Sequence, residues 1–368
     1  RRMSVMQSGP AGGGPHAGGS LTPETKLRKA GLFEVFSDLG AKKAASITSV
    51  TDADLKRRRS FGDKDEEVLC PPGADPEDMR AWVLSQGVGW VCKKGMKPEA
   101  PNQDSFSVLM VENQFALYGV LDGHGPYGHD VSDMARELVV KLFLSDPSRS
   151  ADPGAALESA FLETQKVLEA TREADPSASG ATATLAYHDY AKDTVTIAHI
   201  GDSRAVLAER APGQGLVEVT DLTVDHKPNL EKERHRIESA DPPGRVVFDG
   251  FYNHRVFAQN GMYPGLNMSR AFGDVLAHRE AGLTAAPDVR TINLKADRKK
   301  GEVMLLICTD GVWEFIESQE AADTVRNGTE EQLGEAVETL ARESYQRWMQ
   351  DSDNEIADDI TAILISLY

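Results

Sequence analysis

Short apolar runs recur along the chain from Ala81 onward, each bounded by polar residues or glycine. They are rich in β-branched residues, and this length and composition is typical of strands in a packed core. We therefore predict strands at 105–111, 115–121, 194–200, 303–309 and 360–367. Even the longest is far shorter than the roughly 20 apolar residues that a membrane-spanning helix needs.

Three other stretches carry apolar residues at helical spacing. Asp130 is predicted to cap the first, and the third begins at Thr329, where Thr-Glu-Glu-Gln has the capping-box pattern. The apolar positions are Val131, Met134, Ala135, Leu138, Val139 and Leu142; Leu157, Ala160, Phe161, Thr164, Val167 and Leu168; and Leu333, Val337, Leu340, Tyr345 and Trp348. These stripes are interpreted as core-facing surfaces. Strand clusters separated by helix clusters favour an α+β arrangement.

Two segments depart from this pattern. Residues 1–80 begin with a glycine-rich stretch, so composition predicts a weakly structured extension whose apolar part docks on a main domain of residues 81–368. Within it, 27–39 fits a short amphipathic helix, and the basic run 56–59 before Ser60 fits a solvated tail. Residues 216–274 are rich in charge, glycine and proline, with a predicted hairpin in which Asp249-Gly250 joins 245–248 to 251–252. We expect this segment to form a flap over the strand framework.

Composition narrows the class of protein. The chain has 368 residues, 40% of them hydrophobic, which is enough for a substantial core. Its formal net charge of -18 argues against nucleic acid as a partner. The three cysteines are widely spaced, so we expect no disulfide framework and a reducing compartment, the cytoplasm with the nucleus as the alternative. Nothing in the pattern indicates a coiled coil, and we expect a monomer.

Aspartates stand at the edges of several predicted strands. Asp122, Asp202 and Asp310 follow strand runs, whereas Asp104 and Asp358 come just before them. In an antiparallel sheet the end of one strand lies beside the start of its neighbour, so these carboxylates are expected on one rim. Carboxylates that lie close together repel one another unless cations bind among them and neutralise their charge. Hard oxygen ligands without an accompanying Cys/His set favour Mg²⁺ or Mn²⁺, which would activate a water as nucleophile.

The run Asp122-Gly123-His124 is the most informative part of this set. Asp-Gly often forms a hairpin turn, but here it leads into a Gly-rich loop, as Asp310-Gly311 leads into a helical segment. Asp122 is the best candidate to bridge two ions, and Gly123 would let its carbonyl approach one of them. A histidine with an ordinary pKa near ~6.5 suits protonation of a leaving alcohol. A structural histidine in a turn is the alternative for His124.

The chain resembles the metal-dependent serine/threonine protein phosphatases of the PPM class (type 2C). The motifs that carry the resemblance occur in family order from about Ala81 to the C-terminus. They are Asn102-Gln103-Asp104-Ser105, Asp122-Gly123-His124-Gly125, Ser179-Gly180-Ala181-Thr182-Ala183, Gly201-Asp202-Ser203-Arg204, Asp225-His226-Lys227-Pro228, Ser269-Arg270-Ala271-Phe272-Gly273-Asp274, Thr309-Asp310-Gly311-Val312-Trp313-Glu314 and Asp358-Asp359-Ile360-Thr361. The resemblance implies a central β-sandwich of two antiparallel sheets flanked by helices, in four layers α-β-β-α, with a binuclear metal site at one end.

The resemblance also implies roles for individual residues. Asp122 would bridge both ions and Gly123 would lend its carbonyl, while Asp310 and Asp358 would hold one ion and Asp104 would support the other. His124 would be the general acid. Asp202, with Glu314 nearby, would belong to a weaker third metal position. The residues expected to be structural or flap-positioning are Thr182, Arg204, Asp225 and Asp274.

The sequence departs from the family pattern at three places. Gln103 stands where many relatives have Glu, and Asp359 replaces the usual Asn after the last metal aspartate. Where some relatives place an arginine for the substrate phosphate, this chain offers Lys93, Lys94 and Lys97. We favour Lys97, although lysine lacks the bidentate fork of arginine.

These observations favour an enzyme that hydrolyses phosphoserine and phosphothreonine in phosphorylated proteins, by attack of a hydroxide that bridges two metal ions. A pseudophosphatase scaffold should have lost the metal aspartates, and this chain retains Asp122, Asp310 and Asp358. A hydrolase of small phosphorylated metabolites is the third alternative.

Overall fold

The computed structural model describes residues 43–51, 61–97, 101–172, 174–210, 218–294, 301–326 and 332–367. The predicted helix at 27–39, the basic run before Ser60 and the capping residue Thr329 lie outside these ranges.

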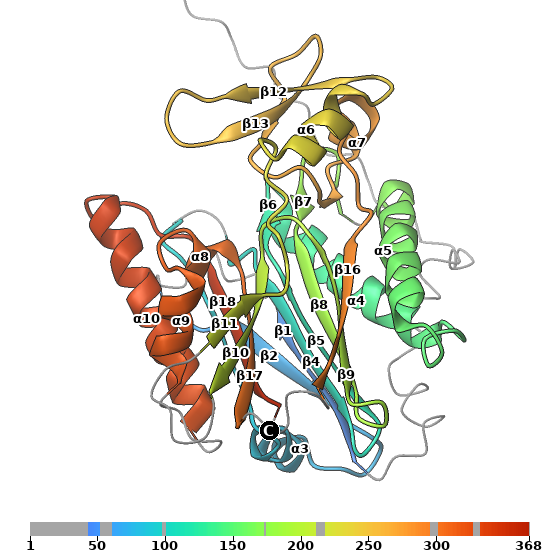
Figure 1. Cartoon of the computed structure of the whole chain (residues 1–368), viewed down its shortest axis with the longest axis vertical. Helices are drawn as coiled ribbons and strands as arrows, with labels where there is room; N and C mark the ends of the chain where they lie inside the picture. Colours follow the sequence, from blue (N-terminus) through green and yellow to red (C-terminus); the bar gives the residue numbers. More distant parts are fainter. Residues whose placement is uncertain are drawn as a thin grey trace, which may run out of the picture.

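Two antiparallel sheets form the centre of the molecule (Figure 1). The first has seven strands in the order β16-β9-β8-β5-β4-β1-β2, and the second has five in the order β11-β10-β17-β18-β3. Their bounds are β1 Ala44–Val50, β2 Asp65–Leu69, β3 Val88–Lys93, β4 Ser105–Val111, β5 Phe115–Leu121, β8 Ala183–Asp189, β9 Thr194–Ile200, β10 Arg204–Arg210, β11 Glu218–Asp221, β16 Asp288–Asn293, β17 Glu302–Cys308 and β18 Ile360–Ser366.

Helices cover both outer faces, and a smaller set of elements stands at one end. The helices are α3 Pro76–Ser85, α4 Gly128–Ser145, α5 Pro153–Ala170, α6 Glu231–Glu238, α7 Val275–Glu280, α8 Asp310–Trp313, α9 Ser318–Val325 and α10 Leu333–Asp351. The remaining strands are β6 Gly123–His124, β7 Gly180–Ala181 and β15 Phe272–Gly273 in one small sheet, and β12 Gly244–Phe248, β13 His254–Ala258 and β14 Pro264–Leu266 in another.

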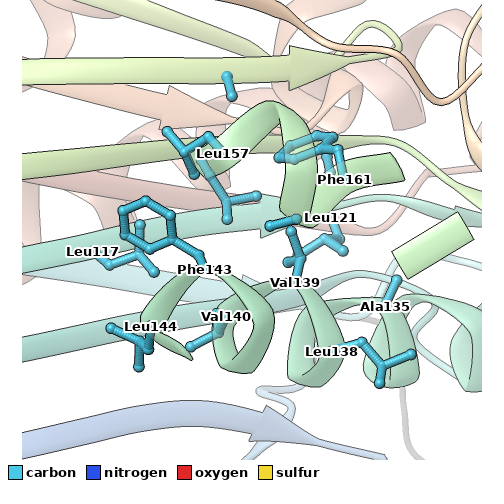
Figure 2. Close-up of a cluster of buried hydrophobic side chains, with 14 of the residues drawn as sticks. Leu117, Leu121, Ala135, Leu138, Val139, Val140, Phe143, Leu144, Leu157 and Phe161 are labelled. Atoms are coloured by element: carbon cyan, nitrogen blue, oxygen red, sulfur yellow. The ribbon is translucent and has the colours of Figure 1, made fainter. Parts of the chain in front are cut away.

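The alternation of side chains along the strands explains the four layers. On β5, Leu117 and Leu121 join the cluster under α4 and α5, where Phe143 and Phe161 also pack (Figure 2). Their neighbour Tyr118 points to the opposite face and joins the cluster between the two sheets. A third cluster packs α9 and α10 on the five-stranded sheet. The predicted α-β-β-α architecture is confirmed.

Most of the predicted elements are present, with shifts at their ends. The strands at 105–111, 115–121 and 194–200 coincide with β4, β5 and β9, and β17 and β18 each end one residue early. The first helix begins at Gly128, so Asp130 lies in its first turn and does not cap it. The third helix begins at Leu333, after Gln332, which makes no side-chain capping bond.

The globular part of the chain starts before Ala81, contrary to the expected boundary. Strand β1 pairs with both β2 and β4 in the seven-stranded sheet, and all its residues except Val50 are buried. Its sequence is Ala-Ala-Ser-Ile-Thr-Ser-Val, where small and hydroxyl residues replace the bulky apolar ones that mark a strand by composition. Composition therefore missed it, and pairing with neighbouring strands determines its structure.

Most of the segment predicted as a flap stands above one end of the sandwich, where Figure 1 draws α6, β12 and β13 in yellow and orange. Its first strand, β11, belongs instead to the five-stranded sheet. The predicted hairpin is present, but its returning strand is β13 and not 251–252. The carboxylate of Asp249 accepts the backbone N–H groups of Phe251, Tyr252 and Asn253, which closes a longer loop. Phe251 and Tyr252 are 80% and 89% exposed, so they form the tip of this loop.

Candidate active site

Sheet register brings the predicted acidic residues to the end of the sandwich that faces the flap. Arg204 pairs with Cys308, so Asp202 and Asp310 extend from the ends of adjacent strands. Ser105 pairs with Leu121, so Asp104, just before β4, and Asp122, just after β5, also extend from the ends of adjacent strands. Asp358 precedes β18, which lies next to β17. Strand pairing thus gathers residues that are up to about 250 positions apart in the sequence.

The electrostatics of Asp122 and Asp310 show how close these groups lie. Burial raises the pKa of Asp122 well above its usual range, and the charges of Asp310, Asp104 and Asp358 raise it further. Burial together with Asp202 and Asp358 raises the pKa of Asp310 to about 7. The carboxyl groups of Asp122 and Asp310 are also within hydrogen-bonding reach of each other. Such a cluster strongly favours a cation.

Asp104 is fixed from several sides. The hydroxyl of Thr309 donates a hydrogen bond to its Oδ2 at 2.8 Å, and the Lys64 ammonium donates to its backbone carbonyl at 2.6 Å. The side chain is buried, and burial together with the charge of Asp359 raises its pKa well above the usual range. Asp104 is therefore a preoriented oxygen donor beside the other carboxylates.

Two lysines neutralise part of this acidic cluster. Lys97 forms an ion pair with Asp358, and Lys227 forms one with Oδ2 of Asp202. The other carboxylate oxygen of Asp202 is buried and has no hydrogen-bond partner among the described residues. An unpartnered buried carboxylate oxygen is costly, and a bound cation would satisfy it.

Within the described ranges, no three His, Cys, Asp or Glu side chains have a ready cation-binding geometry. Two of the aspartates, Asp358 and Asp202, are paired with Lys97 and Lys227 instead. The chemistry of the donors is nevertheless that of a site for a hard divalent cation, because all of them are carboxylate or carbonyl oxygens. Together with the open oxygen of Asp202, this donor set fits Mg²⁺ or Mn²⁺.

Backbone contacts hold Asp122 and Gly123 in place. The N–H of Asp122 donates to the hydroxyl of Thr182 at 3.1 Å, and the N–H of Thr182 donates to the Asp122 carbonyl at 2.9 Å. A side chain at Gly123 would collide with the carbonyl oxygen of Gly128, 2.4 Å from where its Cβ would lie. Only glycine fits here, and Thr182 positions the Asp122 backbone.

His124 lies in β6 and is bonded to Asp274. Its Nε2 is 2.6 Å from Oδ2 of Asp274, while Nδ1 is buried and has no partner in the described part of the chain. Burial by itself lowers the pKa of His124, but the Asp274 carboxylate outweighs it, and the net direction is upward. Sequence reasoning classed Asp274 as structural or flap-positioning and missed this pairing. The φ of +42° at the buried Asp274 indicates a constrained backbone. This angle is known only from the structure, so the sequence carries no signal for the pairing.

Asp359 and the three lysines near it contact different partners. The Asp359 carboxylate accepts the backbone N–H groups of Gly95 and Gln103, both at 2.7 Å. An asparagine offers one carboxamide oxygen, so it could not accept in the same way with both atoms. Lys93 pairs with Asp63 and Glu338, and Lys94 donates to the Lys97 carbonyl. Of these three lysines, Lys97 is the one whose ammonium group contacts an aspartate of the cluster.

The remaining predicted residues lie around this centre. Gln103 donates from Nε2 to the carbonyl of Gly125 at 2.7 Å, which ties the loops before β4 and after β6 together. Arg204 forms a two-pronged ion pair with Asp225. Glu314 is exposed one helical turn after Asp310, and its N–H donates to the Asp310 carbonyl at 2.9 Å.

Comparison with known proteins gives the context of this arrangement. A family model described as "Protein phosphatase 2C" matches residues 92–353. The chain is 34% identical over 361 residues to "Probable protein phosphatase 2C 34" of Arabidopsis thaliana, covering 91% of this chain and 94% of the relative. It is 32% identical over 314 residues to "Probable protein phosphatase 2C 35" of the same plant, and the match covers 79% of this chain and 84% of the relative.

Solved structures share the fold. The serine-threonine phosphatase 2C of Toxoplasma gondii superposes with a TM-score of 0.62 at 21% identity, covering 76% of this chain and 94% of that one. A C. elegans sex determining protein gives a TM-score of 0.60 at 20% identity, covering 76% and 64%. No helix of the described ranges is long and apolar enough to cross a membrane. Family model, curated relatives and fold agree, so the chain belongs to the protein phosphatase 2C (PPM) family of serine/threonine protein phosphatases.

Proposed function

We propose that this protein hydrolyses phosphoserine and phosphothreonine in protein substrates by direct attack of an activated water on phosphorus. The observation that carries the proposal is the gathering of Asp104, Asp122, Asp310 and Asp358 at one end of the sandwich. When bound, two Mg²⁺ or Mn²⁺ ions would supply the activated water and neutralise charge on the phosphoryl oxygens.

The proposed metal ligands are side chains of this cluster and one backbone carbonyl. Asp122 would contact both ions, and the ordered carboxylate of Asp104 would support one of them. Asp310, Asp358 and the Gly123 carbonyl would complete the two positions. Asp202, with its open oxygen, is the candidate for a weaker third ion.

His124 is the proposed general acid. Its Nε2 faces Asp274, so a protonated ring holds one N–H on that carboxylate and keeps Nδ1 for the leaving oxygen of serine or threonine. The upward direction of its pKa favours this protonated form. Lys97, beside Asp358 and 36% exposed at its side chain, is the proposed contact for the substrate phosphate.

The decisive experiment measures phosphate release from a phosphothreonine peptide with Mn²⁺ or Mg²⁺, and again with EDTA. We expect metal-dependent turnover that Asp122→Ala abolishes, because the variant removes the carboxylate that is surrounded by all the others. Asp130→Ala, on the exposed side of α4, is the matched control and should retain activity. Thermal unfolding of both variants verifies that the fold persists.

Three results would contradict the proposal or a part of it. Folded protein that releases no phosphate with either metal would favour a binding scaffold. Faster turnover of small phosphorylated metabolites than of phosphopeptides would favour a metabolite hydrolase. Retained activity in Asp122→Ala would refute the assignment of the two ions.

A further inference from the structure

A cavity of about 380 Å³ lies between the flap and the catalytic core. Part of its lining comes from β13, β14 and the residues around them in the flap, and another part comes from α7 and from Ser177 and Ala178. His124, Gly125 and Asp274 also line it. Its volume falls within the roughly 300–1,000 Å³ that is usual for ligand pockets.

The surface of this cavity is mainly apolar. The side chains that give it this character are Ala178, Tyr263, Leu266, Met268, Leu276 and Ala277. Each charged side chain in its wall already has a partner. His124 is bonded to Asp274, and Arg255 is bonded to Asp249 and to the carbonyl of Gly265. A charged occupant would lose its hydration without gaining an unpaired opposite charge, whereas an apolar occupant gains burial.

The position of the cavity indicates its occupant. His124 belongs both to the cavity wall and to the proposed proton transfer, so the leaving oxygen of the substrate must come close to the cavity. The polypeptide that carries this oxygen continues on both sides of the phosphorylated residue. A neighbouring side chain of the same substrate is therefore the group that reaches the cavity when phosphate lies at the acidic cluster.

We propose that this cavity binds a bulky apolar side chain of the substrate, such as leucine or methionine, next to the phosphorylated residue. The inference rests on the proposed function and adds a substrate class to it: phosphoproteins with an apolar residue beside the phosphoserine or phosphothreonine. Leu276, 39% exposed, lies at a part of the wall that solvent can reach, and Met268 and Ala277 are buried. The apolar surface is thus open to a ligand and backed by the core.

The test compares phosphothreonine peptides that differ only at the residue before or after the phosphothreonine. We expect kcat/KM with Mn²⁺ to be about 10- to 100-fold higher for leucine than for glycine on one side, since burying an apolar group in a pocket discriminates by this order. Leu276→Asp places a charge in the cavity wall and should bring the leucine-to-glycine ratio close to one. Because the ratio is taken within each variant, changes in overall activity cancel.

A matched control comes from the same flap. Phe251→Ser removes an apolar side chain that is 80% exposed at the loop tip and does not line the cavity, so the ratio should stay at its wild-type value. Leu276→Met, which keeps an apolar wall, should also keep the preference. An equal loss of the preference in Phe251→Ser would overturn the assignment to this cavity.

The outcomes separate this inference from the proposed function. Metal-dependent turnover of the glycine peptide with no preference for leucine on either side overturns the cavity proposal and leaves the phosphatase assignment standing. No turnover of any peptide or of an activated aryl phosphate overturns both. A leucine preference that survives Leu276→Asp contradicts the proposed binding place.

Discussion

At the scale of single residues, Gly180 and Asp274 define the surroundings of His124. Asp274 has a φ of +42°, an unusual backbone conformation for a residue with a side chain. Its carboxylate approaches the backbone of Gly180 so closely that a Cβ there would lie 2.2 Å from Oδ2. The absence of a side chain at Gly180 is therefore what lets Asp274 reach Nε2 of His124.

We predict that Gly180→Ala lowers turnover by displacing the Asp274 carboxylate from His124. Burial, which lowers the pKa of His124, would then be opposed only by the weaker effects of Asp202 and Asp310, so the protonated form would be lost at lower pH than in the wild type. The alkaline limb of the pH–kcat profile for a phosphothreonine peptide should shift to lower pH. At pH values above this shifted limb, kcat should fall by about tenfold or more relative to the wild type. An activated aryl phosphate, which needs little proton donation, should be affected less.

Gly334→Ala is the control for this prediction. Gly334 lies in α10, and a Cβ there would meet nothing within 4 Å. The pH profile of this variant should equal that of the wild type. A profile in Gly180→Ala that is lower but not shifted would show that Asp274 does not tune His124.

At the scale of elements, buried ion pairs join the flap to the sandwich. Glu233 of α6 accepts hydrogen bonds from Ser269, from Arg236 and, at both oxygens, from Arg270. Arg270 also binds Asp288 at the start of β16, so the pairs connect the flap directly to the edge of the seven-stranded sheet. Charged residues from three separate segments of the chain thus join the flap to the sandwich.

We predict that Glu233→Gln destabilises the protein at neutral pH. Burial raises the pKa of Glu233, but the hydrogen bonds from Arg270 and Arg236 outweigh it and hold the pKa at about 2 against an ordinary 4.5. A lowered folded-state pKa means that the stabilisation is complete above pH 4.5 and is lost as the pH falls toward 2. The variant should lose about 3 kcal/mol in urea unfolding at pH 7, and less at pH 3.

Glu238→Gln on the same helix is the comparison. Its side chain is 45% exposed and pairs with Arg234 one turn away, so the variant should lose less than about 1 kcal/mol. If the loss in Glu233→Gln were as large at pH 3 as at pH 7, its charge would not be the source of the stability.

At the scale of the whole molecule, the packing of buried faces between the layers provides the stability. The pairing of strands brings the residues of the acidic cluster together. The helices α4 and α5 cover one outer face of the sandwich, as Figure 2 shows for Leu157 and Phe161 above Leu117 and Leu121. Figure 1 shows β6, which directly follows Asp122 in the chain, at the end of the sandwich below the flap, and α3 at the opposite end. Stability and chemistry thus depend on different parts of the same framework.

We predict that Leu157→Ala lowers the free energy of unfolding by about 2–5 kcal/mol, because it leaves a cavity in the layer between α5 and the sheet. Leu162→Ala on the same helix is the matched control. Leu162 is 38% exposed and should lose less than about 1 kcal/mol. Urea unfolding measures both variants, and equal losses would contradict the layer assignment.

The sequence by itself determined those elements whose apolar pattern is strong and local. Strands β4, β5 and β9 follow from runs of bulky residues, and the three long helices follow from apolar stripes. The same local pattern indicated the acidic residues, because each stands at one edge of such a run, either just after it or just before it.

Tertiary structure decided what depends on partners distant in the sequence. Strand β1 has a weak pattern of its own and is held by pairing with β2 and β4. The bond between His124 and Asp274 joins residues 150 positions apart, and no local pattern encodes it. Asp359 similarly serves backbone groups of two distant loops. Local sequence specifies which residues can be buried and which carry a charge. The pairing of the strands determines which of these residues contact one another.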